Sequence, residues 1–320
     1  MGKTLITGGA GFIGHELTRQ LAEDGEEVIV FDNFINFIPP EKSKYEDYVT
    51  LRMEKIKDKA TIVRGDVRYR SSISKAIDEH KPDTVVHTAA LPIATTSAKY
   101  PDIATDINLG GTNKVLDSII NSDSVERFIF TSSSMTYGNF IKPTADEKHP
   151  KHPLGIYGGT KLCGEILTKS YCKEAGIDYI IIVPSAVYGP TDSNRRVSQI
   201  FIDNAMEEKP LILHDGGESK LDFSYIKDVA NGFKLAVQKK AVKNETFNIT
   251  RGEGRKIKEF AEILKKYFPD LEIKVEPSKH ERPERGSLDI SKAKKLLGYE
   301  PEYSLEEGIK EYVEFVKKHQ

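Results

Sequence analysis

The sequence predicts an α/β fold in which a doubly wound parallel sheet is joined to a smaller mixed α/β lobe. Through the first half of the 320 residues, short apolar runs alternate with segments of helical spacing, which is typical of βαβ units. The runs are apolar on both faces, as expected of parallel strands that helices cover on both sides. After about residue 185, turn-forming clusters and shorter strands replace this alternation. This change predicts a second lobe.

The elements follow in order along the chain. The expected strands are TLIT, EVIVF, ATIVR, TVVHTA, RFIFTSS and DYIIIVPS. The expected helices cover residues 12–24, 71–80, 101–122, 157–175 and, with one apolar side near the C-terminus, 304–318. We therefore predict a domain at residues 1–184, to which segments at about 215–250 return, and a lobe at 185–320.

A glycine-rich turn, GGAGFIG, follows the first expected strand and opens the first helix. Gly9, Gly11 and Gly14 fit G-x-G-x-x-G in the strand–turn–helix context that dinucleotide binding requires. Glycine allows the backbone to approach a pyrophosphate, whose charge then lies at the helix N-terminus. The alternative is an ordinary glycine-rich turn. The position of this one favours a Rossmann-type domain.

An acidic residue ends the second expected strand. Asp32 lies eighteen residues after Gly14, where a carboxylate accepts hydrogen bonds from the ribose hydroxyls of an adenosine and repels a 2′-phosphate. The alternative is a surface aspartate that begins a turn. We therefore expect the cofactor to be NAD rather than NADP.

Three side chains suited to alcohol oxidation occur later in the domain. TSSSMTYGN at 131–139 follows an apolar run, and Tyr157 and Lys161 in YGGTK are four residues apart, on one face of a helix. A nearby ammonium and a positively charged nicotinamide favour the phenolate of a tyrosine, whose pKa is otherwise about 10. With a serine to hold the substrate oxygen, the set suits removal of a proton from an alcohol while hydride passes to NAD.

Taken together, these motifs resemble those of the extended short-chain dehydrogenase/reductases in the NAD-dependent epimerase/dehydratase family, which act on nucleotide sugars. The resemblance covers nearly the whole chain. It rests on GGAGFIG, DN at 32–33, GDV at 65–67, HTAA at 87–90, TSSSMTYG, YGGTK, VYGP at 187–190, LDFSYIKDVA at 221–230 and RPERGSLDISKAKKLLGYEP at 282–301.

The resemblance implies roles for individual residues. Tyr157 is the expected base, Lys161 is expected on the nicotinamide ribose, and Ser133 is the expected third catalytic residue, with its neighbour Ser134 left open. Arg282 is expected at the diphosphate of the substrate, which suits a forked guanidinium. The expected cofactor-binding residues are Gly8, Gly11, Phe12, Ile13, Gly14, Asp32, Asn33, Asp66, Val67, His87, Ala89, Ala90, Asn108, Thr131, Tyr157, Lys161, Pro184 and Val187.

An absent carboxylate narrows the expected reaction. Sugar 4,6-dehydratases of this family carry Asp and Glu directly after the catalytic hydroxyl residue, and nucleotide-glucuronate decarboxylases carry a Glu two positions after it. This chain has Ser134 and Met135. We therefore predict a nucleotide-sugar 4-epimerase, which oxidises C4 only transiently. The alternatives are a nucleotide-sugar 4-dehydrogenase or reductase, for example on a heptose or deoxysugar for surface polysaccharide, and, less favoured, a non-catalytic NAD-binding protein.

The chain departs from the family pattern at three positions. Val183 and Leu221 stand where relatives have arginines, and Ala186 stands where an asparagine is common. Lys220, Arg195 and Arg196 are the candidate replacements for the phosphate-binding arginine at position 221, and we favour Arg196, with Arg195 second. The expected substrate-binding residues are therefore Ser133, Ser134, Tyr157, Arg195, Arg196 and Arg282.

Composition disfavours several other classes. The formal net charge is −2 and no stretch concentrates basic residues, so we expect no nucleic-acid partner. No apolar run approaches the roughly eighteen residues of a transmembrane helix, and the histidines lack metal-ligand spacing. We expect a cytoplasmic protein with no membrane partner and no metal. By resemblance, we expect it to be a homodimer formed through the helices at 101–122 and 157–175.

Overall fold

A parallel sheet forms the centre of the molecule in the computed structural model, which describes residues 2–35, 44–278 and 283–319. In these residues the strands of the seven-stranded sheet follow the order β12-β7-β5-β4-β1-β2-β3, and each neighbouring pair is parallel. Its strands are β1 (Lys3–Thr7), β2 (Glu27–Asp32), β3 (Thr61–Arg64), β4 (Thr84–His87), β5 (Arg127–Thr131), β7 (Asp178–Val183) and β12 (Glu245–Asn248). The predicted Rossmann-type α/β fold is confirmed.

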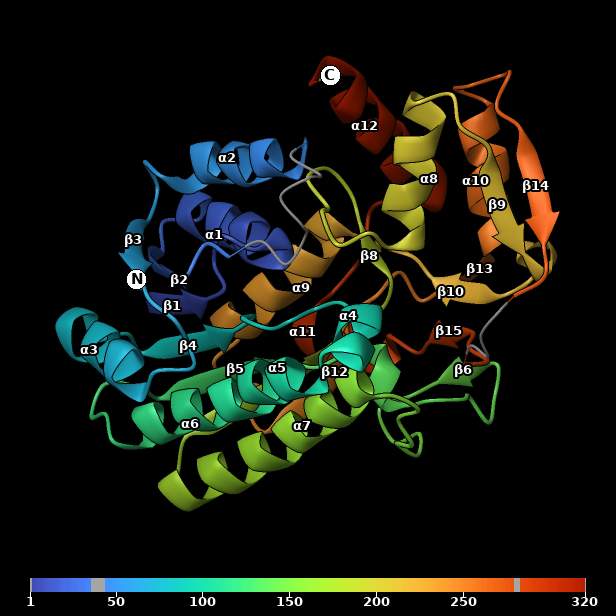
Figure 1. Ribbon diagram of the computed structural model, residues 1–320. Helices are drawn as coiled ribbons and strands as arrows, with labels where there is room; N and C mark the ends of the chain where they lie inside the picture. The colour runs from blue at the N-terminus through green and yellow to red at the C-terminus, as the bar shows by residue number, and fades with distance from the viewer. Residues whose placement is uncertain (1, 36–43, 279–282, 320) are drawn as a thin grey trace.

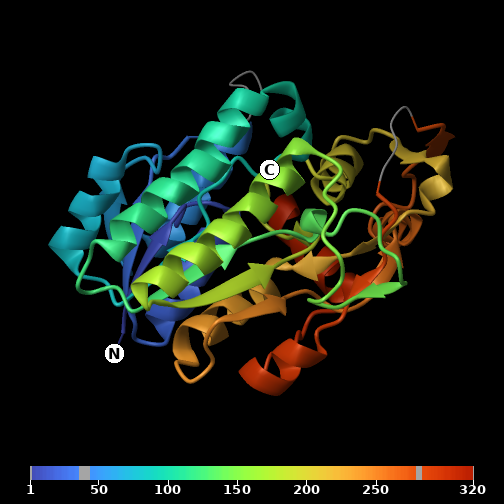
Figure 2. The ribbon, with the colours of Figure 1, turned by 90° about the horizontal axis from the view of Figure 1, so that it is seen from below.

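Helices cover both faces of the sheet (Figure 1). One layer contains α3 (Arg70–His80), α6 (Thr112–Ile120) and α7 (Ile156–Ala175), in which α6 contacts both of the others. On the opposite face α1 (Phe12–Glu23) contacts α2 (Lys44–Ile56) and α9 (Ile226–Gln238). Figure 2 shows α6 and α7 side by side across the sheet. This double covering explains why the strands are apolar on both faces.

The helix expected at 101–122 is divided in the structure. It consists of α5 (Pro101–Thr105), a π-helix (Asp106–Gly111) and α6, and a short helix, α4 (Ala94–Lys99), precedes it. Gly110 and Gly111 are poor helix formers, and the side chain of Asn108 bonds to the backbone of Leu91. The wider turn brings Asn108 toward β4, in keeping with the frequent placement of π-bulges at functional sites.

The C-terminal segments form small strand pairs and helices. The pairs are β8 (Val187–Tyr188) with β11 (Ser224–Tyr225), β9 (Leu211–His214) with β14 (Ile273–Glu276), β10 (Lys220–Asp222) with β13 (Gly254–Lys256), and β6 (Thr144–Ala145) with β15 (Ser287–Leu288). The helices are α8 (Val197–Met206), α10 (Ile257–Lys265), α11 (Ser291–Leu297) and α12 (Leu305–Lys318). Between them the chain returns to the sheet through α9 and β12. The boundary at residue 184 stays a prediction.

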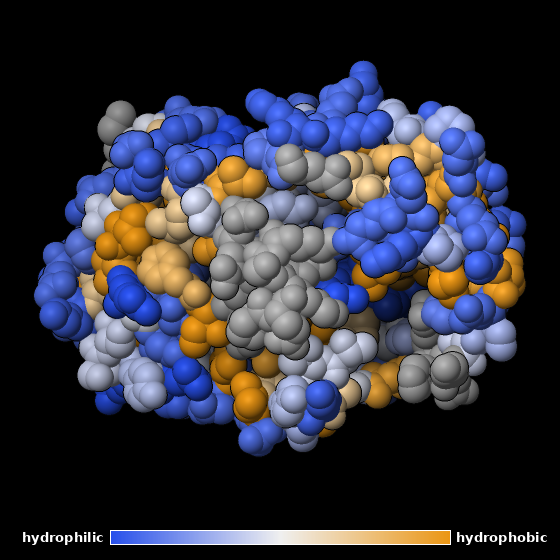
Figure 3. All heavy atoms as spheres, turned by 45° about the horizontal axis from the view of Figure 1, so that its top comes forward, coloured by the Kyte–Doolittle hydropathy of each residue, from blue (hydrophilic) through white to orange (hydrophobic). Residues whose placement is uncertain are grey.

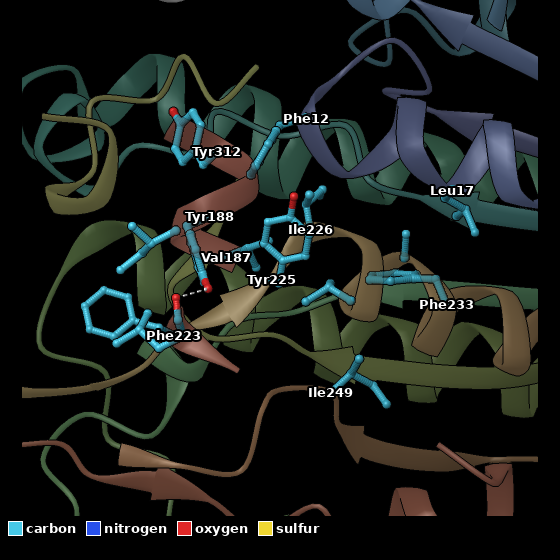
Figure 4. Close-up of a cluster of buried hydrophobic side chains, with 14 of the residues drawn as sticks. Phe12, Leu17, Val187, Tyr188, Phe223, Tyr225, Ile226, Phe233, Ile249 and Tyr312 are labelled. Carbon is cyan, nitrogen blue, oxygen red and sulfur yellow. Dashed lines mark hydrogen bonds between the residues drawn. The ribbon is translucent and has the colours of Figure 1, made fainter. Parts of the chain in front are cut away.

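One core joins the sheet to the C-terminal segments. Figure 4 shows Phe12 of α1, Tyr188 of β8, Tyr225 of β11 and Tyr312 of α12 in one buried cluster. The hydroxyl of Tyr188 donates to the carbonyl oxygen of Leu305, at 3.4 Å. Burial of each large apolar side chain contributes roughly 1.5–3 kcal/mol. The position of the C-terminal segments relative to the sheet is therefore set by packing rather than by the connecting loops.

The outer surface is mixed in character. On the face seen in Figure 3, hydrophilic residues alternate with smaller apolar groups. In the part of the chain that the structure describes, no helix has the length and apolar character needed to cross a membrane. Within the same residues, no cluster of three or more His, Cys, Asp or Glu side chains has a geometry that could hold a metal ion.

Candidate active site

A cavity opens at the carboxyl ends of β1, β2 and β4, the edge at which doubly wound sheets bind ligands. It encloses about 1080 Å³ of empty space, part of it open to solvent. Twelve of the predicted site residues line it: Gly8, Gly11, Phe12, Ile13, Gly14, Asp32, Asn33, Asp66, Val67, Ala89, Ala90 and Arg196.

The glycine turn forms the floor of this cavity because only glycine fits there. Gly8 has φ +71°, and a Cβ on it would lie 2.7 Å from the backbone nitrogen of Ala89. A Cβ on Gly14 would lie 2.1 Å from the carbonyl oxygen of Gly8. The turn therefore presents bare backbone at the N-terminus of α1, which suits a pyrophosphate.

Carboxylates define the far end of the cavity. Asp32 accepts from the backbone N–H groups of Ala10 (3.0 Å) and Phe34 (2.8 Å). Burial raises the pKa of Asp32, and these backbone donors partly oppose the rise. Nearby, the amide of Asn33 donates to Asp66, whose pKa is lowered to about 2 chiefly by its bonds with Arg68. Since both acids lie beside the glycine turn, the cavity fits a dinucleotide whose adenosine ribose carries free hydroxyls.

Helix α7 presents Tyr157 and Lys161 beside the end of β5. Lys161 is buried, and its Nζ donates to the carbonyl oxygen of Thr131 at 2.9 Å. Burial lowers the pKa of Lys161 to about 8. The ammonium therefore points inward, toward the strand end that carries the serine run.

Ser133 and Tyr157 meet in the structure. Ser133 caps the 3₁₀ turn Ser134–Thr136, its Oγ accepting from the N–H of Met135 at 3.2 Å. Burial raises the pKa of Tyr157, whereas the charge of Arg196 and a hydrogen bond with Ser133 lower it. Lys161 and the nicotinamide were the expected sources of positive charge, and Arg196 is a further one in the structure. Arg196 also lines the cavity, so it links the cavity to Tyr157.

Comparison with known proteins agrees with this geometry. Residues 4–250 match the model of the NAD dependent epimerase/dehydratase family. The chain belongs to this family. It is therefore an enzyme whose cofactor is NAD.

The relatives are similar over their whole length. A Methanocaldococcus jannaschii protein, provisionally assigned as a UDP-glucose 4-epimerase, is 33% identical over 323 residues that cover 98% of each chain. The Thermotoga maritima UDP-glucose 4-epimerase, solved with UDP-glucose, superposes with a TM-score of 0.89 at 30% identity over 99% of each chain. The Bacillus cereus UDP-glucuronic acid 4-epimerase, solved with UDP-glucuronic acid and NAD, gives 0.90 at 29% identity over 99% of this chain and 100% of that one.

Two of the predicted cofactor-binding residues, Asn108 and His87, do not line the cavity but lie behind the residues that do. Asn108 holds the segment after β4, its Oδ1 accepting from the N–H of Leu91 at 2.7 Å. The ring of His87 lies between the sheet and α6, bonded to the hydroxyls of Thr7 in β1 (2.7 Å) and Thr112 in α6 (3.0 Å). Asn108 thus positions the backbone that carries Ala89 and Ala90, and His87 does not line the cavity.

The remaining predicted residues lie at the ends of β5 and β7. The hydroxyl of Thr131 is buried without a hydrogen-bond partner among the described residues. Ser134 is bonded to Ser185 through its hydroxyl (3.0 Å) and to Pro184 through its backbone (3.0 Å). Val187 is buried in β8.

The two candidate arginines of the substrate side differ in placement. Arg196 Nη1 donates to the carbonyl oxygen of Val187 at 3.2 Å. Arg195 has φ +51°, and its backbone N–H donates to the side chain of Gln199. Arg282 lies outside the described residues.

Two candidate binding residues were not predicted from the sequence. Arg52 of α2 lines the cavity, and an arginine in an otherwise ordinary amphipathic helix gives no signal. Arg285 lines a second hollow with Lys142, Lys220 and Glu284, and its Nε is buried without a hydrogen-bond partner in the part of the chain described. Arg285 stands three residues after Arg282, so the motif that predicted Arg282 could also have indicated Arg285.

Proposed function

We propose that the protein is an NAD-dependent UDP-sugar 4-epimerase. The observation that carries this proposal is the pairing of Ser133 with Tyr157 beside the cavity, where the neighbouring positions Ser134 and Met135 carry no carboxylate. Dehydration needs further acid and base groups to remove water, whereas epimerisation at C4 needs one base and one hydroxyl. The named functions of the Thermotoga maritima and Bacillus cereus relatives support the same reaction.

The chain's own groups perform the proton chemistry. Tyr157, as phenolate, takes the proton of the sugar 4-hydroxyl, and the hydroxyl of Ser133 holds the same oxygen. Arg196 stabilises the phenolate, because its charge lowers the pKa of Tyr157. NAD supplies a hydride acceptor when it is bound. After the 4-keto sugar has turned over, C4 regains its hydride on the opposite face, which inverts the configuration there, and Tyr157 returns the proton to the 4-oxygen.

Cations around the substrate side suit a nucleoside diphosphate. Leu221 replaces the usual arginine, and its partner across the β10–β13 pair, Arg255, is engaged by Glu259 and Glu306. We infer that the diphosphate is met by Arg196 and by Arg282 or Arg285. The buried Nε of Arg285 has no hydrogen-bond partner among the residues that the structure describes. Each charge-assisted hydrogen bond is worth roughly 1.5–3 kcal/mol, so two such arginines replace the lost contact.

A panel of UDP-, GDP-, CDP- and dTDP-sugars tests the reaction. We expect the purified protein to interconvert a UDP-sugar and its C4 epimer, as detected by NMR or chromatography, without net formation of NADH. Tyr157→Phe is expected to lower kcat by roughly 10²–10⁴-fold while the protein still binds NAD. Accumulation of NADH and a keto product would instead identify a 4-dehydrogenase, and retained biological activity in Tyr157→Phe would favour a non-catalytic role.

The proposal also includes an oligomeric state and a cellular location. We infer a homodimer that contacts its partner through α5, α6 and α7, and a cytoplasmic site of action where nucleotide sugars are made. The apolar side chains that these helices expose support the dimer.

A further inference from the structure

Arg52 is a buried arginine that ties α2 to the loop between β8 and α8. It is 5% exposed. Its Nε donates to the hydroxyl of Thr191 at 3.3 Å, and its Nη2 donates to the hydroxyl of Ser193 at 2.9 Å and to the carbonyl oxygen of Thr191. These contacts join positions 139 and 141 residues apart in the chain. A guanidinium donates in several directions at once, so one side chain holds both ends of this short segment.

The loop at residues 191–195 is held in a conformation that it would not adopt alone. Thr191 has φ +70° and is fully buried, and Arg195 has φ +51°. A β-branched residue in this region of the backbone map is strained. Asp192 between them is fully buried, and its Oδ2 has no hydrogen-bond partner among the described residues. Such a segment keeps its shape only where its surroundings hold it.

Arg52 is charged as it makes these bonds. Burial lowers its pKa to about 10, and the charges of Asp192 and Asp32 oppose this fall. The guanidinium is therefore protonated at neutral pH. Its charge interacts both with Asp32, at the ribose end of the cavity, and with Asp192 of the loop.

The same loop covers the cavity and carries the charge that acts on the catalytic phenol. Ser193, Asn194 and Arg196 line the cavity together with Arg52 itself. Arg196 follows this loop directly before α8, and its Nη1 donates to the carbonyl oxygen of Val187 at 3.2 Å, which fixes the guanidinium whose charge lowers the pKa of Tyr157. A shift of the loop would therefore open one side of the cofactor site and withdraw Arg196 from Tyr157.

We propose that Arg52 is a positioning residue that fastens this loop over the bound NAD and thereby aims Arg196 at Tyr157. The second part rests on the proposed function; the first part does not. An enzyme that returns its hydride to the same substrate benefits from keeping its cofactor bound. By holding the loop closed, the Arg52 contacts would slow release of the cofactor more than the glycine turn alone would.

The test measures release of the cofactor rather than turnover. Protein loaded with a fluorescent etheno-NAD is mixed with excess NAD, and the dissociation rate is followed by fluorescence. Arg52→Ala is expected to raise this rate roughly ten- to a hundredfold, because it removes three charge-assisted bonds. Arg52→Lys is expected to be intermediate, since an ammonium lacks the fork that reaches both Thr191 and Ser193.

A second variant covers the case in which Arg52→Ala does not fold. Thr191→Val with Ser193→Ala keeps Arg52 and the loop's shape but removes two acceptors, and we expect a several-fold faster release. Arg70→Ala is the matched control, because it removes an exposed arginine that pairs with Asp117 at 2.6 Å. Its release rate should equal that of the wild type. Wild-type release from folded Arg52→Ala, or from the double variant, would overturn the fastening role.

Steady-state kinetics at saturating NAD test whether Arg52 positions Arg196 beside Tyr157. Arg52→Ala is expected to keep a kcat at least tenfold below the wild-type value even when NAD is saturating, because Arg196 is displaced from Tyr157. Recovery of the wild-type kcat would overturn this part. If the wild type epimerises none of the sugars, the proposed function fails, yet the release rates still decide whether Arg52 fastens the loop.

Discussion

His87 is a titratable residue that the fold holds neutral. It is 1% exposed, its two ring nitrogens are bonded to Thr7 and Thr112, and burial lowers its pKa to about 3. The ordinary pKa of histidine is about 6.5. The unfolded chain therefore binds a proton at this position between about pH 6.5 and pH 3, and the folded chain does not.

This difference sets the sign of a pH effect on stability. Because the folded pKa lies below the unfolded one, the contribution of His87 is fully present above about pH 6.5 and is lost as pH falls below it, by up to about 1.4 kcal/mol per pH unit. Asp222, whose pKa burial raises to about 7, acts in the opposite direction. The difference in unfolding free energy between the wild type and His87→Gln therefore reports the contribution of His87 alone.

Urea unfolding of both proteins at pH 6.5, 5.5 and 5.0 measures this effect. Gln keeps one donor and one acceptor for the two threonines but does not titrate. We expect the stability advantage of the wild type over His87→Gln to shrink steadily as pH falls. An advantage that stays constant over this range would show that His87 does not titrate as the structure implies.

At the scale of elements, sequence patterns predicted best where one local signal decides the structure. The helix expected at 157–175 is α7 (Ile156–Ala175), and the GGAGFIG turn forms the floor of the cavity. The helix expected at 101–122 was divided by Asn108, whose tertiary bond to Leu91 leaves no trace in periodicity. Arg52 was missed for the same reason, because its partners lie about 140 residues away.

Arg127 is another long-range contact between elements. At the start of β5 it is 2% exposed, and its guanidinium donates to four carbonyl oxygens at the end of α9 and just beyond it, those of Ala236 (2.9 Å), Lys239 (3.2 Å), Lys240 (2.8 Å) and Val242 (2.9 Å). The last carbonyls of a helix have no partner within it. Arg127 therefore closes α9 against the central sheet.

Removal of the Arg127 guanidinium should destabilise the folded protein. We expect Arg127→Leu to lower the free energy of unfolding by about 3–5 kcal/mol, because buried carbonyls lose a charged donor. Urea denaturation measures the loss. Lys75→Ala is the control, since Lys75 is 73% exposed and pairs with Glu79 at 3.7 Å on a helix surface; it should change stability by no more than about 0.5 kcal/mol. A similar small loss for Arg127→Leu would show that α9 does not depend on this contact.

At the scale of the whole molecule, the shared core determines where the reaction can occur. Tyr188, Tyr225 and Tyr312 of the C-terminal segments pack with Phe12 of α1 (Figure 4). Phe12 also lines the cavity. The C-terminal segments are therefore held against the cavity by tertiary packing, which no local sequence pattern encodes. For that reason the sequence patterns indicated Arg196 and the glycine turn of the cavity but not Arg52, which lies beside them.

The layer formed by α5, α6 and α7 (Figure 2) carries the last prediction, that of a homodimer. Ile103 of α5, Ile120 of α6 and Ile166 of α7 are 41%, 37% and 56% exposed. Exposed apolar side chains on neighbouring helices can form part of a contact surface. A second copy of the chain presents the same layer, so a two-fold contact would bury both sets at once.

Sedimentation velocity at micromolar concentration distinguishes the assembly states. We expect the wild type to sediment as a dimer and Ile166→Glu to sediment as a monomer, because two copies of a buried carboxylate would face an apolar surface without partners. Val275→Glu is the matched control, since Val275 is 67% exposed on β14, away from these helices; it should remain a dimer. A monomeric wild type would exclude the dimer, and a dimeric Ile166→Glu would place the contact on another face. Because α7 also carries Tyr157 and Lys161, loss of activity in a monomeric Ile166→Glu that still binds NAD would show that the contact supports the catalytic helix.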